Sequence, residues 1–527
     1  MPEKVGTGMQ LTQGLRRAAQ IRPNGVAIRD GGQVRDWRTE IDRVARLAGA
    51  LRALGLAPGD RVAILALNGA RYFEALFAIP WAGGVAVPVN TRLAAPEIAY
   101  VLEDSGAGIL LIDDSFAGQL ATLGPAGRAL RAVIHLGDAP APAGMAGYEA
   151  ILAATQPAAD AGRGGDDLAG IYYTGGTTGQ AKGVMLSHGN LVSNAMNVIV
   201  CVGYDRDTLY LHAPPMFHLA DGCSTFGVTI QGGGHVFLPR FEPLVFLEAV
   251  ERERVSDVTL VPTMLNMLIS HPRFGDFDLA SFKRIYFGAS PMPDAVLLRA
   301  LALLPHCKFQ QAWGMTELSP IACTMDWRYT VASGPHAGRL RSCGQPVPMV
   351  ELRIVDADGN EVPRGMVGEV VVRGPTVMQG YWQKPEATAA ALRGGWPHSG
   401  DGAYMDDEGF VYIVDRLKDM IVTGGENVYS AEVESAISLL DGVAEVAVIG
   451  IPDETWGEAV HAIVVPRPGR ALDPALVIAH CRGRIAGYKM PRSVTIRTEP
   501  LPLSAAGKVM KTELREPHWR GRDRKVN

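Results

Sequence analysis

The stretch "YYTGGTTGQAKGVMLSHGN", residues 172–190, places four glycines and three threonines around Lys182 within its segment 174–183. It follows an apolar run, 168–174, that predicts a buried strand, and it leads into 187–200, which predicts a helix capped by Ser187. A glycine-rich turn from a strand into a helix brings backbone amides close to a negatively charged ligand. The stretch therefore predicts an anion-binding turn, although its composition alone fits a flexible surface loop equally well. It is not a P-loop, because Gly183 rather than Ser or Thr follows Lys182.

Length and composition indicate a soluble protein of several units. A chain of 527 residues corresponds to roughly three to four domain-sized units. Its net charge of -5 does not point to nucleic acid or an anionic membrane as the main partner. The first residues lack the apolar core of a secretory signal, and no uninterrupted apolar run of about 18 residues predicts a membrane span. The six scattered cysteines show no paired metal spacing, so a reducing cytoplasm is expected.

Strand-like and helix-like segments alternate through most of the chain. Four short apolar runs predict strands, and the amphipathic segment 39–55 predicts a helix. These runs are 61–68, 84–90, 108–113 and 132–137. The alternation predicts an α/β fold of layered subdomains.

The pattern changes in the last third. A strand-rich region with turn dipeptides predicts a small β subdomain at about 341–415. Beyond it, helical segments (430–440, 474–485) and strand-like segments (443–451, 459–467, 492–497) precede a loop, 501–511. We therefore expect an N-terminal domain at 1–415 and an α+β C-terminal domain at 416–527.

Four further stretches contain residues suited to chemistry. They are "APPMFHLADG" with His218, "QAWGMTE" with Thr316 and Glu317, the segment 398–434 with Asp401, Arg416 and Lys418, and "LPLSAAGKVMK" with Lys508. Taken singly, each has a structural explanation: a core histidine, a helix cap, a turn aspartate or a solvated loop lysine. Their order and spacing decide between these explanations and a shared site.

Together these motifs resemble the adenylate-forming (AMP-binding) superfamily, specifically its acyl-CoA synthetase branch. The resemblance covers nearly the whole chain through "TGGTTGQAKG", "GMTE", "GD", "RLKD", "GGEN" and a final "GK". Four positions depart from the usual pattern: Gly176 replaces Ser, Ala181 replaces Pro, Trp313 replaces Tyr and Ser430 replaces Pro. The resemblance implies a ligase that joins a carboxylic acid to CoA through an acyl-adenylate, using ATP, Mg²⁺ and CoA.

The resemblance also implies roles for individual residues. The loop is expected to hold phosphates through Thr174, Gly175, Gly176, Thr177, Thr178, Gly179 and Lys182. The adenosine is expected to contact Gly288, Ala289, Ser290, Trp313, Gly314, Thr316, Asp401 and Arg416. Glu317 and Thr177 are the expected magnesium ligands, since that ion prefers hard oxygen donors. Lys508 is expected to bridge the carboxylate and the phosphate, with Lys182 and His218 as further catalytic residues.

The second half-reaction is expected to use a rotated C-terminal domain with its hinge at Lys418. Rotation would withdraw Lys508 and present Gly424 and Gly425, whose missing side chains leave a path for pantetheine. Trp456, Lys489 and Arg492 are further candidates for contacts with CoA.

Three competing functions remain at this stage. An acyl-AMP ligase that loads a carrier protein is expected to carry an insertion between "GMTE" and "DRLKD", which is not apparent. An amino-acid-activating domain needs an Asp near "FH", and His218 stands there instead, although the nearby Asp221 does not exclude that function entirely. A nucleotide-binding module without catalysis is disfavoured by the intact Lys182, Glu317, Asp401, Arg416 and Lys508.

The expected acyl pocket gives only a weak prediction of the acid. Its residues are His218, Ala220, Ser224, Ala312, Pro320 and Ile321. They are mostly small or apolar, and Ala220 stands where related coumarate ligases place a tyrosine that meets the phenol. Because each buried methylene contributes about 0.8 kcal/mol, an aliphatic acid of medium or long chain is favoured. An aryl acid is the alternative.

Overall fold

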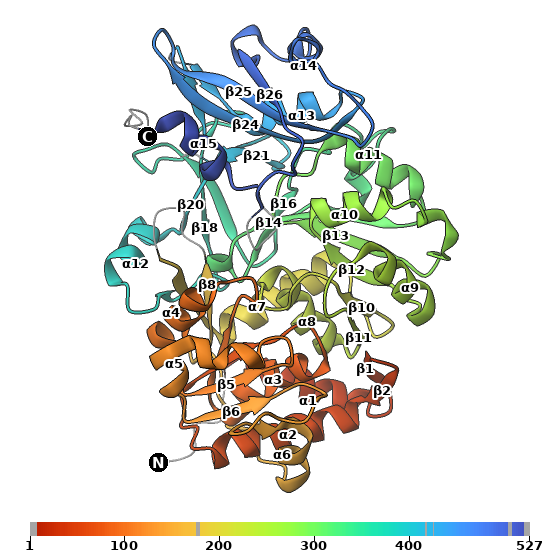
Figure 1. Cartoon of the computed structure of the whole chain (residues 1–527), viewed down its shortest axis with the longest axis vertical. Coiled ribbons are helices and arrows are strands. Elements are labelled where there is room, and N and C mark those ends of the chain that lie inside the picture. Colours follow the sequence, from red (N-terminus) through yellow and green to blue (C-terminus); the bar gives the residue numbers. More distant parts are fainter. Residues whose placement is uncertain (1–7, 175–179, 417–418, 425, 504–508, 521–527) are drawn as a thin grey trace.

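The computed structural model describes residues 8–174, 180–416, 419–424, 426–503 and 509–520. A large N-terminal part carries the small C-terminal part at one end (Figure 1). Within the described residues, three sheets belong to the large part and a fourth to the small part. The predicted fold class, mixed α/β with a β subdomain and a small α+β C-terminal unit, is confirmed.

The first sheet has eight strands in the order β19-β9-β8-β4-β3-β5-β6-β7. The four predicted runs form its central parallel strands, which are apolar except for Arg61 at the start of β3 and His135 at the end of β6, as is typical of parallel strands buried on both faces. The strands are β3 (Arg61–Leu65), β4 (Val85–Pro88), β5 (Ile109–Ile112), β6 (Ala132–His135), β7 (Ala146–Gly147), β8 (Leu168–Thr174), β9 (Lys182–Ser187) and β19 (Gly380–Tyr381). The helices associated with it are α2 (Trp37–Ala53), α3 (Ala70–Ala82), α4 (Ala95–Ser105), α5 (Gly124–Arg128) and α6 (Tyr148–Ala154).

The glycine-rich segment corrects one expectation. It does not run from a strand directly into a helix, because Lys182–Ser187 forms β9, antiparallel to β8. Val184 and Leu186 of β9 are buried, so this segment gains more from pairing in the sheet than from extending the helix. Helix α7 (His188–Val202) then begins at the predicted cap, where Ser187 and Asn190 bond reciprocally to each other's backbone N–H.

The second sheet has nine strands in the order β16-β15-β14-β13-β12-β10-β11-β1-β2. Its strands are β1 (Val26–Asp30), β2 (Gln33–Asp36), β10 (Leu209–His212), β11 (Gly234–Phe237), β12 (Asp257–Leu260), β13 (Arg284–Gly288), β14 (Lys308–Gly314), β15 (Ile321–Thr324) and β16 (Gln345–Pro346). The remaining helices of this part are α1 (Leu11–Ile21), α8 (Leu219–Gln231), α9 (Pro243–Glu253), α10 (Pro262–Ile269) and α11 (Asp294–Leu303). Helix α7 contacts both β9 of the first sheet and β15 of the second, so it joins the two layers.

The strand-rich region forms a four-stranded antiparallel sheet, and the C-terminal part forms its own sheet. The former contains β17 (Glu351–Val355), β18 (Gly368–Arg373), β20 (His398–Met405) and β21 (Val411–Arg416), whereas α12 (Pro385–Ala391) contacts β19 of the first sheet. The latter contains β22 (Ile421–Thr423), β23 (Glu426–Val428), β24 (Val443–Asp453), β25 (Gly457–Pro466) and β26 (Ser493–Ile496). Its helices are α13 (Ser430–Ser438), α14 (Pro474–Cys481) and α15 (Lys511–Trp519), the last not predicted from the sequence. Short 3-10 turns are η1 (Ala117–Leu123), η2 (Phe274–Asp276), η3 (Thr316–Leu318), η4 (Trp327–Tyr329), η5 (Arg393–Gly395) and η6 (Gly487–Lys489).

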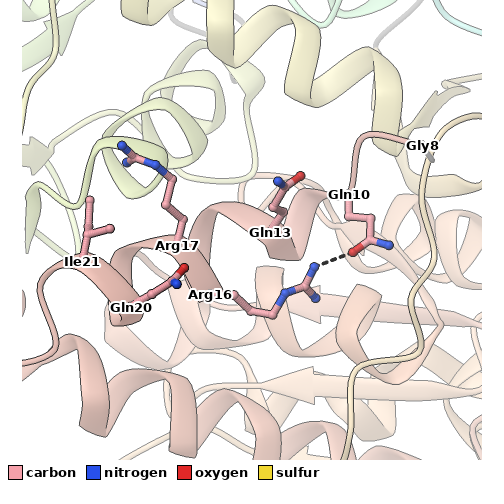
Figure 2. Close-up of a pocket in the computed structure, with 7 residues that line it drawn as sticks. All are labelled: Gly8, Gln10, Gln13, Arg16, Arg17, Gln20 and Ile21. Atoms are coloured by element: carbon pink, nitrogen blue, oxygen red, sulfur yellow. Dashed lines mark hydrogen bonds between the residues drawn. The ribbon is translucent and has the colours of Figure 1, made fainter. Parts of the chain in front are cut away.

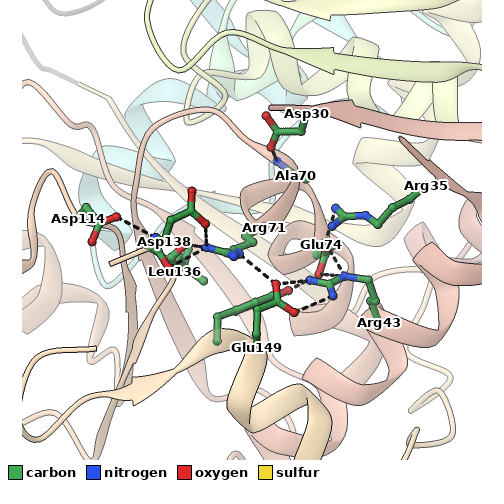
Figure 3. Close-up of polar contacts among 12 residues, drawn as sticks. Asp30, Arg35, Arg43, Ala70, Arg71, Glu74, Asp114, Leu136, Asp138 and Glu149 are labelled. Atoms are coloured by element: carbon green, nitrogen blue, oxygen red, sulfur yellow. Dashed lines mark hydrogen bonds and ion pairs between the residues drawn. The ribbon is translucent and has the colours of Figure 1, made fainter. Parts of the chain in front are cut away.

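A buried ionic network joins helices α2, α3 and α6 (Figure 3). The carboxylate of Glu74, on α3, is fully buried and accepts hydrogen bonds from Arg35 at 2.7 Å and Arg43 at 3.0 Å. Arg43 also pairs with Glu149 of α6 at 2.8 Å. Buried carboxylates are tolerated only when they are paired in this way. In the described part of the chain, no helix is long and apolar enough to cross a membrane.

Candidate functional site

The segment "GMTE" and the end of the glycine-rich loop meet at Tyr381. Glu317 lies in η3 and is buried, and its Oε1 accepts a hydrogen bond from the Tyr381 hydroxyl at 2.8 Å. The ammonium of Lys182 lies 4.9 Å from the centroid of the Tyr381 ring. Burial and the neighbouring Glu317 raise the pKa of Tyr381, so the phenol stays protonated and donates. A cation and a carboxylate from distant motifs therefore share one aromatic residue.

Tyr381 is a site residue that sequence reasoning missed. It pairs with Val184 across β19 and β9, which brings a residue of the strand-rich region into the first sheet. Its local sequence, "MQGYWQ", carries no motif, so only this long-range pairing reveals it.

Close backbone packing holds the "GMTE" turn in place. A Cβ added at Gly314 would lie 1.8 Å from the carbonyl oxygen of Pro320, which explains why no larger residue fits there. The Met315 N–H donates to that same carbonyl at 2.9 Å. The side-chain amide of Asn194, on α7, donates to the carbonyls of Leu318 and Ile321. The expected site residues Gly314, Thr316, Pro320 and Ile321 thus belong to one rigid turn.

Trp313 and Asp401 come together from different sheets. The indole N–H of Trp313, on β14, donates to Oδ2 of Asp401, on β20, at 2.9 Å, and both residues are buried. The backbone of Asp401 is the ladder partner of Arg416 on β21. The structure therefore brings the expected adenine-stacking ring and ribose acceptor into direct contact.

The predicted segment Gly288, Ala289 and Ser290 lies beside Trp313. Gly288 ends β13 and pairs with Ala312, the residue before Trp313. A Cβ at Gly288 would lie 2.3 Å from the carbonyl oxygen of Ala312, so the two strands approach closely. Ala289 has a φ of 69°, a left-handed conformation that non-glycine residues rarely adopt.

The expected acyl residues lie on and around α8. His218 precedes this helix, and its ring packs against Phe217 with centroids 4.3 Å apart. Ser224 is fully buried, and its hydroxyl lies 3.0 Å from that of Tyr204 and 3.5 Å from that of Thr259. Ala312 and Ile321 belong to one core cluster with three buried tyrosines, Tyr204, Tyr210 and Tyr286. The space behind the expected acyl pocket is therefore filled by aromatic rings and hydroxyl groups.

The carboxylate of Asp221 is engaged inside the protein. Its carboxylate is fully buried and is bonded to the Tyr210 hydroxyl at 3.1 Å and to Nδ1 of His212 at 2.5 Å. Since both oxygens are engaged inside the protein, the structure removes the reason for considering an amino-acid-activating domain.

Three of the expected CoA residues, Gly424, Trp456 and Arg492, meet in the C-terminal part, and Lys489 does not join them. A Cβ at Gly424 would lie 2.5 Å from Cε3 of Trp456, and the Arg492 guanidinium lies 4.6 Å from the Trp456 ring centroid. Trp456 is nevertheless 43% exposed, so this Trp–Arg stack is open to a ligand. Lys489 is instead paired with Glu432 at 2.8 Å.

Several predicted residues fall outside the described residues. They are Gly175, Gly176, Thr177, Thr178, Gly179, Lys418, Gly425 and Lys508. Thr174 and Lys182, which flank the loop, are ladder partners at the loop end of the β8–β9 hairpin.

A cavity of about 650 Å³ lies along α1, and none of its lining residues belongs to these motifs (Figure 2). It is polar, but its two arginines are already bonded: Arg16 to Asp160 and Gln10, and Arg17 to the carbonyl of Ile230. The motifs rather than this cavity identify the functional site.

Comparison with known proteins agrees with the geometry. The model of the AMP-binding enzyme family matches residues 15–382, and that of the AMP-binding enzyme C-terminal domain matches 432–508. The chain belongs to the AMP-binding enzyme family. Members related to it include a feruloyl-CoA synthase of Amycolatopsis sp, 42% identical over 95% of this chain and 97% of that protein.

Two further members of the family are named for different acids. The indoleacetate–CoA ligase of Aromatoleum aromaticum is 36% identical over 96% of this chain and 98% of its own length. The long-chain-fatty-acid–CoA ligase FadD13 of Mycobacterium tuberculosis is 35% identical over 96% of this chain and 97% of its own length. ATP-bound MatB from Rhodopseudomonas palustris superposes with a TM-score of 0.87 at 32% identity, covering 97% of this chain and 99% of that one. The chain is accordingly an acid–CoA ligase that uses ATP, Mg²⁺ and CoA.

Proposed function

We propose that the protein converts an aromatic carboxylic acid into its CoA thioester through an acyl-adenylate. The observation that carries this choice of acid is the cluster of Tyr204, Tyr210 and Tyr286 behind Ala312 and Ile321. Rings in that position limit the length of a chain and offer a stacking surface to a compact aromatic acid. The relatives named for ferulate and indoleacetate support the same class.

The hydroxyl pair of Tyr204 and Ser224 supports an acid with a polar ring substituent. Ala220 supplies no phenol partner, but Ser224 lies one helical turn further along α8 and carries a hydroxyl. The aliphatic acid favoured by the sequence is the second candidate, because FadD13 is 35% identical to this chain.

Adenylation requires positive charge where two anions meet. Two like charges about 4 Å apart repel by roughly 4 kcal/mol at an effective dielectric of 20. In this proposal Lys182 and the amides of 175–179 hold the outer phosphates, and Lys508 bridges the carboxylate and the α-phosphate. Trp313 and Asp401, joined by their hydrogen bond, bind adenine and ribose with Arg416 assisting.

The residues around Glu317 fit a magnesium ion. A buried carboxylate beside a phenol is a hard oxygen donor, and Thr177 would add a hydroxyl. The described residues contain no cluster of three or more His, Cys, Asp or Glu side chains suited to a metal. Phosphate oxygens and water would therefore complete the coordination, as is usual for this ion. When bound, the ion would neutralise charge on the phosphates.

The second half-reaction belongs to the same proposal. We place the domain division at 415/416 and the hinge at Lys418, with Gly424, Gly425 and the Trp456–Arg492 stack contacting CoA. The proposal includes a cytoplasmic location. All six cysteines are free, as is typical of proteins in a reducing compartment.

A panel of acids tests the proposed substrate class. kcat/KM would be measured with saturating ATP and CoA for butyrate, octanoate, palmitate, benzoate, coumarate and ferulate. We expect one of the aryl acids to exceed octanoate and palmitate by about tenfold or more, a factor that pocket contacts routinely supply. A higher value for octanoate or palmitate than for every aryl acid would overturn the aromatic assignment.

A further inference from the structure

A chain of buried polar side chains runs from α8 through the second sheet and back to α8. We call it the relay and define it as Tyr210, Asp221, His212, His235 and Thr229. Tyr210 bonds to Oδ1 of Asp221, whose Oδ2 lies 2.5 Å from Nδ1 of His212. His212 Nε2 lies 2.9 Å from Nδ1 of His235, and His235 Nε2 lies 3.1 Å from the Thr229 hydroxyl. All five residues are fully buried.

The hydrogen bonds of the relay have a definite direction. The Thr229 hydroxyl donates to the carbonyl of Thr225 at 2.8 Å, so it accepts from Nε2–H of His235. Burial lowers the pKa of His235 well below its usual range, so the ring is neutral and its Nδ1 accepts from Nε2–H of His212. At the other end of the relay, His212 Nδ1 hydrogen-bonds with Oδ2 of Asp221 at 2.5 Å. Every link is then satisfied, the condition under which a buried polar network rigidifies its surroundings.

Aromatic packing fixes the two histidine rings. His212 stacks on Phe237 with centroids 4.8 Å apart and planes within 8°. The His235 ring lies 4.7 Å from that of Phe73, on α3, and 6.1 Å from that of Trp37, on α2. The relay therefore contacts the helices of the first sheet as well as the strands of the second.

The relay attaches to one face of α8, while the expected acyl residues lie on another. Asp221 and Thr229 are eight residues apart, two turns of helix, and Thr225 lies between them on the same face. Ala220 and Ser224 lie on the neighbouring face, where Ser224 meets Tyr204. The Asp221 N–H donates to the His218 carbonyl at 3.1 Å, so the acidic end of the relay lies in the turn that carries His218.

We propose that the relay is a positioning device that fixes the first turn of α8 and thereby the wall of the acyl site. Its residues do not touch the reacting atoms; they hold His218, Ala220 and Ser224 at the distance that the acid requires. This inference rests on the proposed function in placing the acyl site beside α8.

The test compares Asp221→Ala with Asp221→Asn. The alanine variant removes the anchor for Tyr210 and His212, whereas the asparagine amide can accept from Tyr210 and donate to His212. We expect Asp221→Ala to raise the KM for the acid by about tenfold, since small displacements at a site have effects of this order. KM values for ATP and CoA should change less than about twofold, and Asp221→Asn should restore the KM for the acid to near its wild-type value.

Glu74→Gln is the matched control for a general loss of stability, because it alters a buried carboxylate that lies outside the relay. If Asp221→Ala does not fold, His235→Phe replaces it in the test, because this variant keeps a ring but removes both hydrogen bonds. Its KM for the acid is expected to rise. Equal effects of Asp221→Ala and Asp221→Asn, or an unchanged KM for the acid in His235→Phe, would overturn the inference. All KM values are measured with the acid that the wild type prefers. The ranking of acids by the wild type tests the proposed function. The ratio of the variant's KM for that acid to the wild-type KM tests the relay.

Discussion

Trp313 joins the two ends of the proposed adenosine site, because its indole N–H holds the Asp401 carboxylate. Trp313→Phe keeps an aromatic ring but removes this donor. A hydrogen bond to an ionised group contributes about 1.5–3 kcal/mol, so we expect kcat/KM for ATP to fall by roughly tenfold or more. Steady-state rates at varied ATP measure this. Trp327→Phe, at a residue that is 40% exposed, is the control. Unchanged kcat/KM in Trp313→Phe would contradict the assignment.

Tyr381 orients Glu317 through a single hydrogen bond. Tyr381→Phe removes the hydroxyl and keeps the ring beside Lys182. Groups that orient a metal ligand typically change metal affinity by 10–100-fold, so the Mg²⁺ concentration for half-maximal rate should rise by about tenfold. The matched control is Tyr173→Phe. Tyr173 lies on β8, in the same sheet as Tyr381, and its hydroxyl donates to Asp104 at 2.6 Å. If both variants need the same Mg²⁺ concentration, Tyr381 does not act on the ion.

At the scale of elements, local patterns predicted what depends on local sequence. Short apolar runs identified β3 to β6, and Ser187 identified the start of α7. The hairpin of β8 and β9 was missed, because "KGVMLS" forms a strand only by pairing with Tyr172 and its neighbours. Tyr381 was missed for the same reason. The motifs predicted Glu317, Trp313 and Asp401 as site residues. They did not predict the contact of Trp313 with Asp401, which joins two sheets, or that of Glu317 with Tyr381, which involves a third.

His188 connects α7 to α1 and makes stability depend on pH. Its Nδ1 accepts from the Leu11 N–H at 3.1 Å, and burial lowers its pKa from 6.5 to about 4. Because the folded pKa is the lower one, the unfolded state binds more protons between these values, and stability falls as pH drops from about 6.5 towards 4. His188→Asn keeps an acceptor that does not titrate. Denaturant unfolding at pH 7 and pH 5 should show wild type losing about 2 kcal/mol more than the variant. Parallel losses would contradict this.

The network around Glu74 ties α2, α3 and α6 together. Arg43→Met removes one of the two arginines paired with this fully buried carboxylate, so unfolding free energy should fall by about 3–5 kcal/mol. Arg353→Met, at an exposed pair with Glu351, should cost less than about 1 kcal/mol. Equal stability of the two variants in urea denaturation would show that the network contributes little.

For the whole molecule, the proposal requires one small domain to serve two half-reactions. Lys508→Ala should reduce acyl-adenylate formation by about 10²-fold or more, the usual effect of removing one preorganised charge. Thioester formation from supplied acyl-adenylate should be largely preserved, because Lys508 has been withdrawn at that stage. Rapid-quench measurement of each step separates them. An equal loss in both steps would argue against a C-terminal domain that presents different residues to the active site in the two half-reactions.

The most direct test of the account is a two-stage experiment with ferulate. The protein is first incubated with ferulate, ATP and Mg²⁺, and CoA is then added while adenylate and thioester are quantified. The account predicts pyrophosphate release with no more than one bound feruloyl-adenylate per protein molecule, followed by its conversion to feruloyl-CoA when CoA is added. Absence of an adenylate with ferulate and with every other aryl acid of the panel, or an adenylate that CoA does not consume, would contradict it.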